Sequence, residues 1–190
     1  MFNIVIFGPP GSGKGTQSSK LAEKYNLKHI STGDIFRNEI RAESALGLKV
    51  KSIIESGELV SDELLIDLLR SAMQKASGHS GFLFDGYPRT IQQAHDLETL
   101  LKEMNARVDV VLALDVHDDE LMERILKRAQ LEGRKDDTPE VIANRLKVYH
   151  NQTKPLTEHY KSQEKLENIH GVGSVEEIFE NLCQAIDKRK

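Results

Sequence analysis

The segment from Gly8 to Thr16 reads Gly-Pro-Pro-Gly-Ser-Gly-Lys-Gly-Thr, with Lys14 as its only charged residue. A short apolar run comes before it, and apolar residues at helical spacing follow it. Glycines let successive backbone N–H groups turn inward, the start of the helix adds partial positive charge, and Lys14 adds a full charge. The pattern therefore predicts a cradle for a di- or triphosphate. A glycine-rich turn with an ordinary lysine is the alternative, which the surrounding strand and helix make less favourable.

The residue after Lys14 departs from the general form of this pattern. That form has Ser or Thr there as a ligand of Mg²⁺, whereas this chain has Gly15, with Thr16 one place later. Direct ligation of magnesium by the loop therefore does not follow from the sequence. Asp85 ends a second apolar run, Gly81–Phe84, and would lie at the mouth of a parallel sheet. A carboxylate there can hold Mg²⁺ directly or through water, although an Asp-Gly turn is the alternative.

Several arginines follow. A guanidinium suits bidentate contact with phosphate, and Arg89 directly follows Pro88, which constrains the backbone there. Any single arginine is more often a solvated surface residue, but same-face positive pairs such as Arg124 and Arg128 repel each other on a helix. Phosphoryl transfer requires positive charge around the moving group, so a cage of Lys14 and arginines would serve it. The further candidates are Arg134 and Arg145.

The elements that must position these side chains can be read from the apolar pattern. Continuous apolar runs suit strands buried on both faces of a parallel sheet, and segments with a 3.6-residue period lie between them. The alternation of the two predicts βαβ units, an α/β fold with the sheet covered on both sides. The expected strands are Phe2–Phe7, Lys28–Ser31, Gly81–Phe84, Val108–Val116 and Leu166–Ile169.

Helix starts are marked by capping residues. Ser61 precedes the acidic pair Asp62 and Glu63, and Ser174 precedes the last apolar stripe. Thr138-Pro139-Glu140 reads as the cap and first turn of a helix that reaches toward Pro155. The segment Ser31–Arg37 has the pattern of a strand end followed by a helix cap. This local structure explains its residue types as well as a binding role would.

Composition narrows the classes of protein. With 190 residues the chain suits one domain, and its net charge of −4 gives no broad field for nucleic acid or anionic membrane. Cys183 is the only cysteine, so neither an intramolecular disulfide nor a cysteine-rich zinc site can form. The first residues lack the form of a signal peptide, and no apolar stretch approaches a membrane span. We expect a cytoplasmic protein.

Taken in order, these motifs resemble the adenylate kinase family over essentially the whole chain. The matching segments are GPPGSGKGTQ, STGDIFR, SGELV, DGYPRTIQQ, RILKR, EGRKDD and NRLKVYH. The resemblance implies a P-loop NTPase three-layer fold with a five-stranded parallel sheet. It also implies one nucleoside monophosphate kinase domain over residues 1–190, with an AMP-binding flap at 31–60 and a lid at 128–135. Only five residues separate Arg128 from Arg134, which is the short-lid form without the long zinc-binding lid.

The resemblance also implies an activity and a set of site residues. The activity is reversible transfer of the ATP terminal phosphoryl group to AMP, giving two ADP, in adenine nucleotide homeostasis and salvage. The residues implied at the ATP phosphates and base are Gly11, Ser12, Gly13, Lys14, Gly15, Thr16, Arg128 and Gly173. Those implied at AMP are Thr32, Arg37, Glu58, Leu59, Val60, Gly86, Tyr87, Pro88, Arg89, Gln93, Arg134 and Arg145. Catalysis would rest on Lys14, Asp85, Arg89, Arg124, Arg128, Arg134 and Arg145. A cis peptide bond before Pro88 is implied as well.

Cofactor and partners follow from the same resemblance. We expect Mg²⁺ carried by the nucleotide phosphates with Asp85 behind its waters, no zinc, and a monomer that binds ATP, AMP and ADP but no nucleic acid or membrane. Gln92 stands where many members have proline. A UMP/CMP kinase is the nearest alternative, against which Thr32 and the segment Thr90–Gln93 argue. A nucleotide-binding module without kinase activity is a third, against which the arginine set argues.

Overall fold

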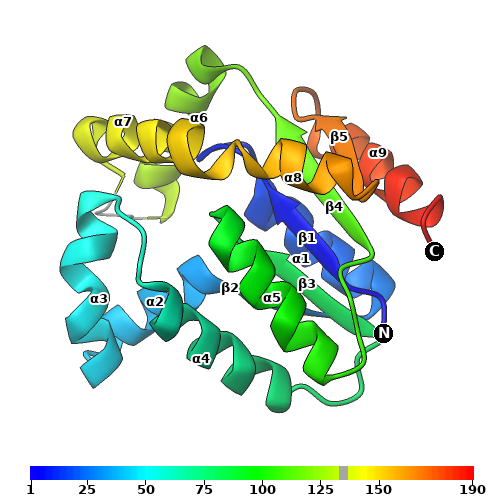
Figure 1. Cartoon of the computed structure of the whole chain (residues 1–190). Helices are drawn as coiled ribbons and strands as arrows, with labels where there is room; N and C mark the ends of the chain where they lie inside the picture. The colour runs from blue at the N-terminus through cyan, green and yellow to red at the C-terminus, as the bar shows by residue number, and fades with distance from the viewer. Residues whose placement is uncertain (133–136) are drawn as a thin grey trace.

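Five apolar runs form the strands of one parallel sheet in the computed structural model, which describes residues 1–132 and 137–190 (Figure 1). The order across the sheet is β2-β3-β1-β4-β5, so β1 is central. The strands are β1 Ile4–Phe7, β2 Leu27–Ser31, β3 Gly81–Asp85, β4 Val110–Asp115 and β5 Leu166–His170. The predicted α/β fold with a parallel sheet is confirmed. β1 starts two residues later than predicted, just after Asn3, whose side chain donates to Arg107 O at 2.7 Å and accepts from Phe82 N at 3.0 Å.

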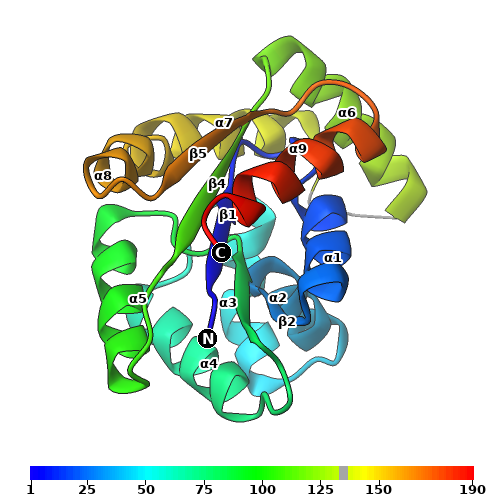
Figure 2. The ribbon, with the colours of Figure 1, turned by 90° about the vertical axis from the view of Figure 1, so that its right-hand side faces the viewer.

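Helices cover both faces of the sheet, and β1 feeds a separate core on each. Val5 and Phe7 belong to one buried cluster and Ile4 and Ile6 to the other, as the alternation of side chains along a strand requires. Figure 2 shows α1 and α9 on one side of the sheet and α5 and α8 on the other. The helices are α1 Lys14–Tyr25, α2 Thr32–Arg41, α3 Ala45–Ser56, α4 Asp62–Gln74, α5 Ile91–Glu103, α6 Asp118–Glu132, α7 Pro139–Val148, α8 Leu156–Ser162 and α9 Val175–Asp187.

The segment after Thr138 differs from its prediction as one helix reaching toward Pro155. Helix α7 ends at Val148, the π-helical turn Tyr149–Thr153 follows, and α8 starts at Leu156. Pro155 lacks the backbone N–H that a continuing helix would use, so a break at this point is expected on physical grounds. The bond between Tyr87 and Pro88 is cis, as predicted.

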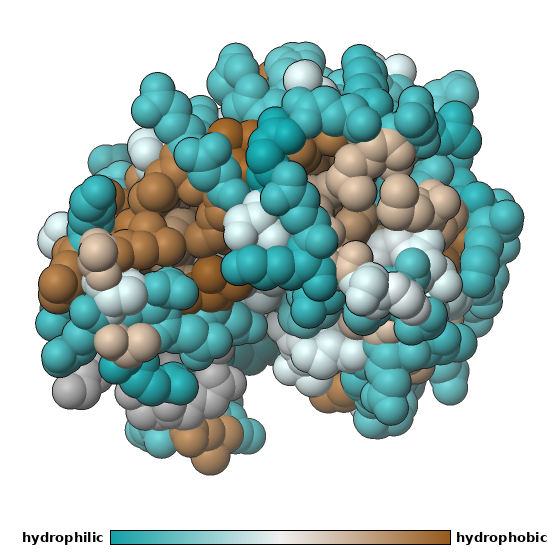
Figure 3. Space-filling model, turned by 90° about the horizontal axis from the view of Figure 1, so that it is seen from below, coloured by the Kyte–Doolittle hydropathy of each residue, from teal (hydrophilic) through white to brown (hydrophobic). Residues whose placement is uncertain are grey.

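The outer elements shape the surface. Helices α2 and α3 lie inside the range 31–60 and stand away from the sheet at one side, below α7 (Figure 1). Seen from below, the surface is notched between two lobes and carries an apolar patch among hydrophilic residues (Figure 3). Within the described ranges, none of the helices is both long and apolar enough to cross a membrane.

Capping side chains begin most of the helices that the sequence marked. Ser31 Oγ accepts from Asp34 N at 3.3 Å, and Thr138 Oγ1 accepts from Val141 N at 3.4 Å. Ser174 forms a full capping box, since its Oγ accepts from Glu177 N at 3.2 Å while Glu177 Oε2 accepts from Ser174 N at 2.9 Å. Ser61 occupies the cap of α4 without a side-chain hydrogen bond to the helix.

This contrast generates a stability prediction. Ser174→Ala removes the hydroxyl that accepts from Glu177 N and donates to Glu177 Oε2, and should lower the free energy of unfolding by about 1 kcal/mol. Ser61→Ala removes a hydroxyl that caps nothing and should cost less than about 0.5 kcal/mol. Urea denaturation followed by circular dichroism measures both. Equal losses in the two variants would contradict the assignment of the box.

Candidate functional site

Most of the predicted site residues line one cavity of about 910 Å³, which lies at the carboxyl ends of β1 and β3. These two strands are adjacent and parallel, with Ile6 opposite Asp85, so the loops that follow them start side by side. The cavity is lined by the loop after β1, the start of α2, residues 57–59, residues 85–89 except Tyr87, and parts of α6 and α7. The site is therefore built from segments distant in sequence at one edge of the sheet.

The loop from Gly8 to Gly13 curls around the amino group of Lys14. Lys14 Nζ donates to Gly8 O and Pro9 O, each at 2.8 Å, and to Ser12 Oγ at 3.3 Å. Gly13 caps α1 in the left-handed conformation with φ +88°, which a side chain would disfavour. The loop thus brings the first backbone N–H groups of α1 and the lysine to one wall of the cavity, as an anion site requires.

Burial changes the acid–base behaviour of Lys14. Desolvation, together with the positive charges of Arg89 and Arg128, lowers the pKa of Lys14 to about 8 against the opposing effect of Asp85. Because a bound phosphate would supply the missing negative charge, ligand binding should favour the ammonium form.

Asp85 lies where the sequence predicts it, at the end of β3 and only 7% exposed. Its Oδ2 is 3.3 Å from His29 Nε2 on β2, a neighbour that sequence reasoning missed. A Cβ at Gly15 would lie 3.9 Å from the same oxygen, so the loop and the carboxylate face each other closely. This donor set suits a hydrated Mg²⁺ on bound phosphates, because Gly15 offers no hydroxyl and Asp85 offers a carboxylate.

Arginines form the opposite wall. Arg89 Nε donates to Gly86 O at 2.9 Å. Burial lowers the pKa of Arg89, and the nearby charges of Arg145 and Arg37 lower it further, while Asp85 opposes them. Arg37 pairs with Asp34 at 2.6 Å. Arg37, Arg89 and Arg145 all line the cavity, so these arginines are gathered around the same space.

Asp137 holds two of the predicted arginines, a contact that the sequence did not predict. Its carboxylate is buried and accepts two hydrogen bonds from Arg128, each at 2.9 Å, and one from Arg145 at 2.7 Å. It therefore fixes two of the predicted arginines relative to each other, from helices α6 and α7. The signal in the sequence was the pair Asp136-Asp137 just before the Thr138 cap, which acidic residues near a helix start also explain.

Two predicted arginines remain, Arg124 and Arg134, and the structure describes only the first. Arg124 lines the cavity and donates to Gly171 O at 3.0 Å, and it also pairs with Glu120 one turn earlier on α6. Arg134 lies outside the described residues. The lid predicted at 128–135 is described only as far as residue 132.

The other residues predicted to bind AMP or the adenine of ATP fall into two groups. Thr32, Val60, Tyr87 and Gln93 are buried and do not line the cavity. Thr32 Oγ1 donates to Gly86 O at 3.0 Å, and the Gln93 amide bonds to Arg89 N and Asp62. Those that line it are Arg37, Glu58, Leu59, Gly86, Pro88 and Gly173.

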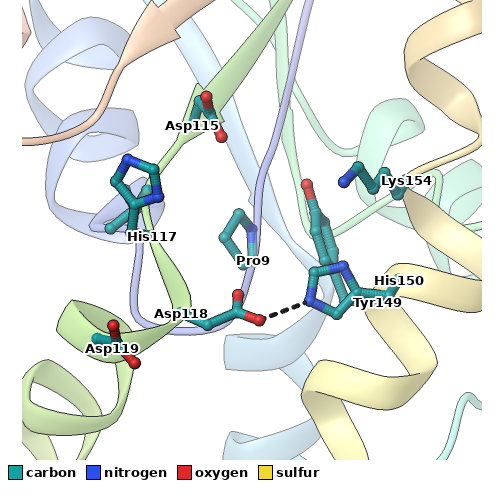
Figure 4. Close-up of a pocket in the computed structure, with 9 residues that line it drawn as sticks. Pro9, Asp115, His117, Asp118, Asp119, Tyr149, His150 and Lys154 are labelled. Carbon is teal, nitrogen blue, oxygen red and sulfur yellow. Dashed lines mark hydrogen bonds and ion pairs between the residues drawn. The ribbon is translucent and has the colours of Figure 1, made fainter.

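A second cavity of about 380 Å³ is lined in part by Pro9 of the phosphate loop (Figure 4). Asp115, Asp118 and Asp119 line it from β4 and α6, with His150 Nε2 3.1 Å from Asp118 Oδ2. Carboxylates repel phosphates, so this cavity is the poorer candidate for a nucleotide. Among the side chains that the structure describes, no group of three or more His, Cys, Asp or Glu residues is arranged to hold a metal ion.

Comparison with known proteins points to one family. The adenylate kinase family model matches residues 6–165. The adenylate kinase of Bacteroides fragilis is 50% identical over 187 residues, which are 98% of this chain and 99% of that protein. That of Bacteroides thetaiotaomicron is 50% identical over 188 residues, 99% of this chain and all of that protein. That of Parabacteroides distasonis is 47% identical over the full length of both chains.

The lowered pKa of Lys14 predicts proton uptake on ligand binding. At pH 8 about half of the free molecules carry a neutral Lys14, and phosphates that restore its charge should bind together with about half a proton. The uptake should fall toward zero at pH 7, and affinity should decline as the pH rises above about 8. Calorimetry of ATP binding in buffers of different ionisation enthalpy measures it. Lys14→Met should abolish the uptake, and persistence of the uptake in that variant would contradict the assignment.

Proposed function

The chain belongs to the adenylate kinase family, and on this premise we propose how its residues transfer the terminal phosphoryl group of ATP to AMP, giving two ADP. The observation that supports the proposal most strongly is the crowding of Lys14, Arg89, Arg128 and Arg145 around one cavity that also holds the phosphate loop. Like charges repel, and Asp85 and Asp137 offset part of this repulsion, so a polyanion bound between the positive groups would stabilise the arrangement further. A pair of nucleotides joined through their phosphates supplies it.

The donor nucleotide would bind along the phosphate loop. The backbone N–H groups from Gly11 to Thr16 and the ammonium of Lys14 would hold the ATP phosphates, with Arg128 as a further contact. The Gly173 backbone lines the same cavity and would contact the adenine ring. ATP would thus lie between α1, α6 and the start of α9.

The acceptor would bind between α2 and the segment after β3. Arg37 and Arg89 would contact the AMP phosphate, whose oxygen is already anionic and needs no general base to attack. As that oxygen forms its bond to the ATP γ-phosphorus, the bond to the β,γ-bridging oxygen breaks, and ADP leaves. Arg124, Arg145 and Arg134, the last outside the described residues, would stabilise the charge on the moving group.

Magnesium fits this site as an ion on the phosphates rather than in a protein cage. It would supply charge neutralisation to the phosphate oxygens, and Asp85 would hold its waters. His29, 3.3 Å from Asp85, would keep the carboxylate turned toward the loop.

We further propose two moving parts, the AMP-binding flap at 31–60 and the short lid at 128–135, on one domain spanning residues 1–190. Helices α2 and α3 make up most of the proposed flap. Closure of both over the nucleotides would exclude water, which otherwise competes as the acceptor. We also propose that the protein acts as a monomer in the cytoplasm.

The phosphate loop is tested by Lys14→Met. Loss of one charge contact in the transition state should lower kcat by roughly 10²–10³ while the fold is kept, because Lys14 supports little of the core. Lys20→Met is the matched control, since Lys20 lies on the same helix but pairs with Glu176 outside the cavity. Its activity should equal that of the wild type. A Lys14→Met enzyme with more than half of the wild-type turnover would exclude the proposed cradle.

The acceptor is tested by a coupled assay of ATP with AMP, CMP, UMP and GMP. Uracil matches only part of the hydrogen-bond pattern of adenine and would leave buried polar groups unpaired, so AMP should exceed UMP by at least about 10²-fold in kcat/KM. Thr32→Ala combined with Gln93→Leu should narrow this ratio mainly by weakening AMP. Equal rates with UMP or CMP would favour a pyrimidine nucleotide kinase instead.

A further inference from the structure

The amide of Gln93 is held at both ends by partners that allow one orientation. Its Oε1 accepts from Arg89 N at 2.8 Å, and its Nε2 donates to Asp62 Oδ1 at 2.7 Å. A backbone N–H can only donate and an ionised carboxylate can only accept. The side chain is 1% exposed, so water has little access to replace either partner.

Asp62 reaches Gln93 because two helices begin side by side. Asp62 is the first residue of α4, and Gln93 is the third residue of α5. Glu58 and Leu59, four and three residues before Asp62, line the cavity. The sequence explains Asp62 equally well as a first-turn acid, but a first-turn acid need not touch another helix.

Both held atoms keep further hydrogen-bonding capacity. The nitrogen of an amide carries a second N–H and its oxygen a second lone pair, so each can still bind one more group. The Watson–Crick edge of adenine offers an amino donor beside an acceptor nitrogen, which an amide can match with its oxygen and its N–H. Hypoxanthine and guanine offer an acceptor oxygen beside an N–H donor, which would require the amide turned over by 180°.

We propose that Asp62 is a positioning residue that selects adenine over hypoxanthine and guanine at the acceptor site, because it prevents the Gln93 amide from turning over. This inference rests on the proposed function, and it takes Gln93, which the family resemblance places at AMP, as a residue that contacts the AMP base. Turning the amide would place Oε1 against the Asp62 carboxylate and Nε2 against the Arg89 N–H. Asparagine at position 62 can donate as well as accept, so it removes the carboxylate half of this constraint.

The experiment compares AMP with IMP as acceptor in Asp62→Asn, with ATP saturating. We expect kcat/KM for AMP to fall mainly through a higher KM, and the IMP-to-AMP ratio of kcat/KM to rise roughly tenfold, with KM for ATP unchanged. Glu63→Gln is the matched control, because it removes the same charge from the next residue of the same helix turn and is exposed. Its ratio should equal that of the wild type.

Two further variants separate specificity from stability. Asp62→Glu keeps an acceptor-only group and should keep the IMP-to-AMP ratio within about threefold of wild type. Asp62→Ala removes the acceptor and supplies no donor, so it should raise the ratio as Asp62→Asn does, and it replaces Asp62→Asn if that protein fails to fold. If losses in AMP and IMP turnover are equal in every soluble variant, the inference is wrong and Asp62 is structural. If the wild type itself does not prefer AMP, the proposed function fails first.

Discussion

Mutual repulsion among positive charges is the constraint on which the site depends. Lys14, Arg89 and Arg145 share one cavity, and burial together with like charge lowers the pKa of both Lys14 and Arg89. Two nearly buried carboxylates offset part of that repulsion, Asp85 beside the loop and Asp137 between two helices. Bringing such charges together costs free energy that the packed fold must supply, since Lys14 and Arg89 follow β1 and β3 while Arg145 comes from α7 and is held by Asp137. The same unbalanced charge is what gives a polyphosphate its affinity.

The strands could be predicted because they are buried on both faces, so that nearly every residue of β1 and β4 is apolar. Helix starts could be predicted where Thr138 and Ser174 provide capping oxygens. Helix α3 was not predicted, although it runs for twelve residues. It packs beside α2 and fully buries only Gly47 and Val50. Leu46, Ile53 and Ile54 are half-buried against the core, and with Val50 they lie at helical spacing, so the signal for this helix was present in the sequence.

In the site, local motifs predicted the residues but not their partners. Lys14 and Asp85 stand out because a loop or a strand end is encoded by neighbours in the sequence. Asp137, His29 and Asp62 act through contacts that depend on how helices and strands meet, and each has an adequate local explanation as a cap, a strand residue or a first-turn acid. The side chains of Thr32 and Gln93, predicted to bind AMP, also bond to Gly86, Arg89 and Asp62, partners that the sequence did not indicate. Hydrogen bonds between distant segments are set by tertiary packing, which no short pattern contains.

The order of the strands has a consequence for how this protein behaves at high concentration. A sheet that does not close into a barrel has two edge strands, here β2 and β5. Each edge strand has unpaired backbone N–H and C=O groups, to which a strand of another molecule could hydrogen-bond to form an intermolecular sheet. Both edges carry charge or polar groups that discourage this, Lys28 on β2 and Glu167 on β5, the latter paired with Arg189 from the chain terminus at 2.8 Å. The most apolar strands lie in the interior, where no neighbouring molecule can reach them. The strand order therefore disfavours aggregation, because the most apolar strands, whose sequences are best suited to fibril formation, lie where they cannot pair with another molecule.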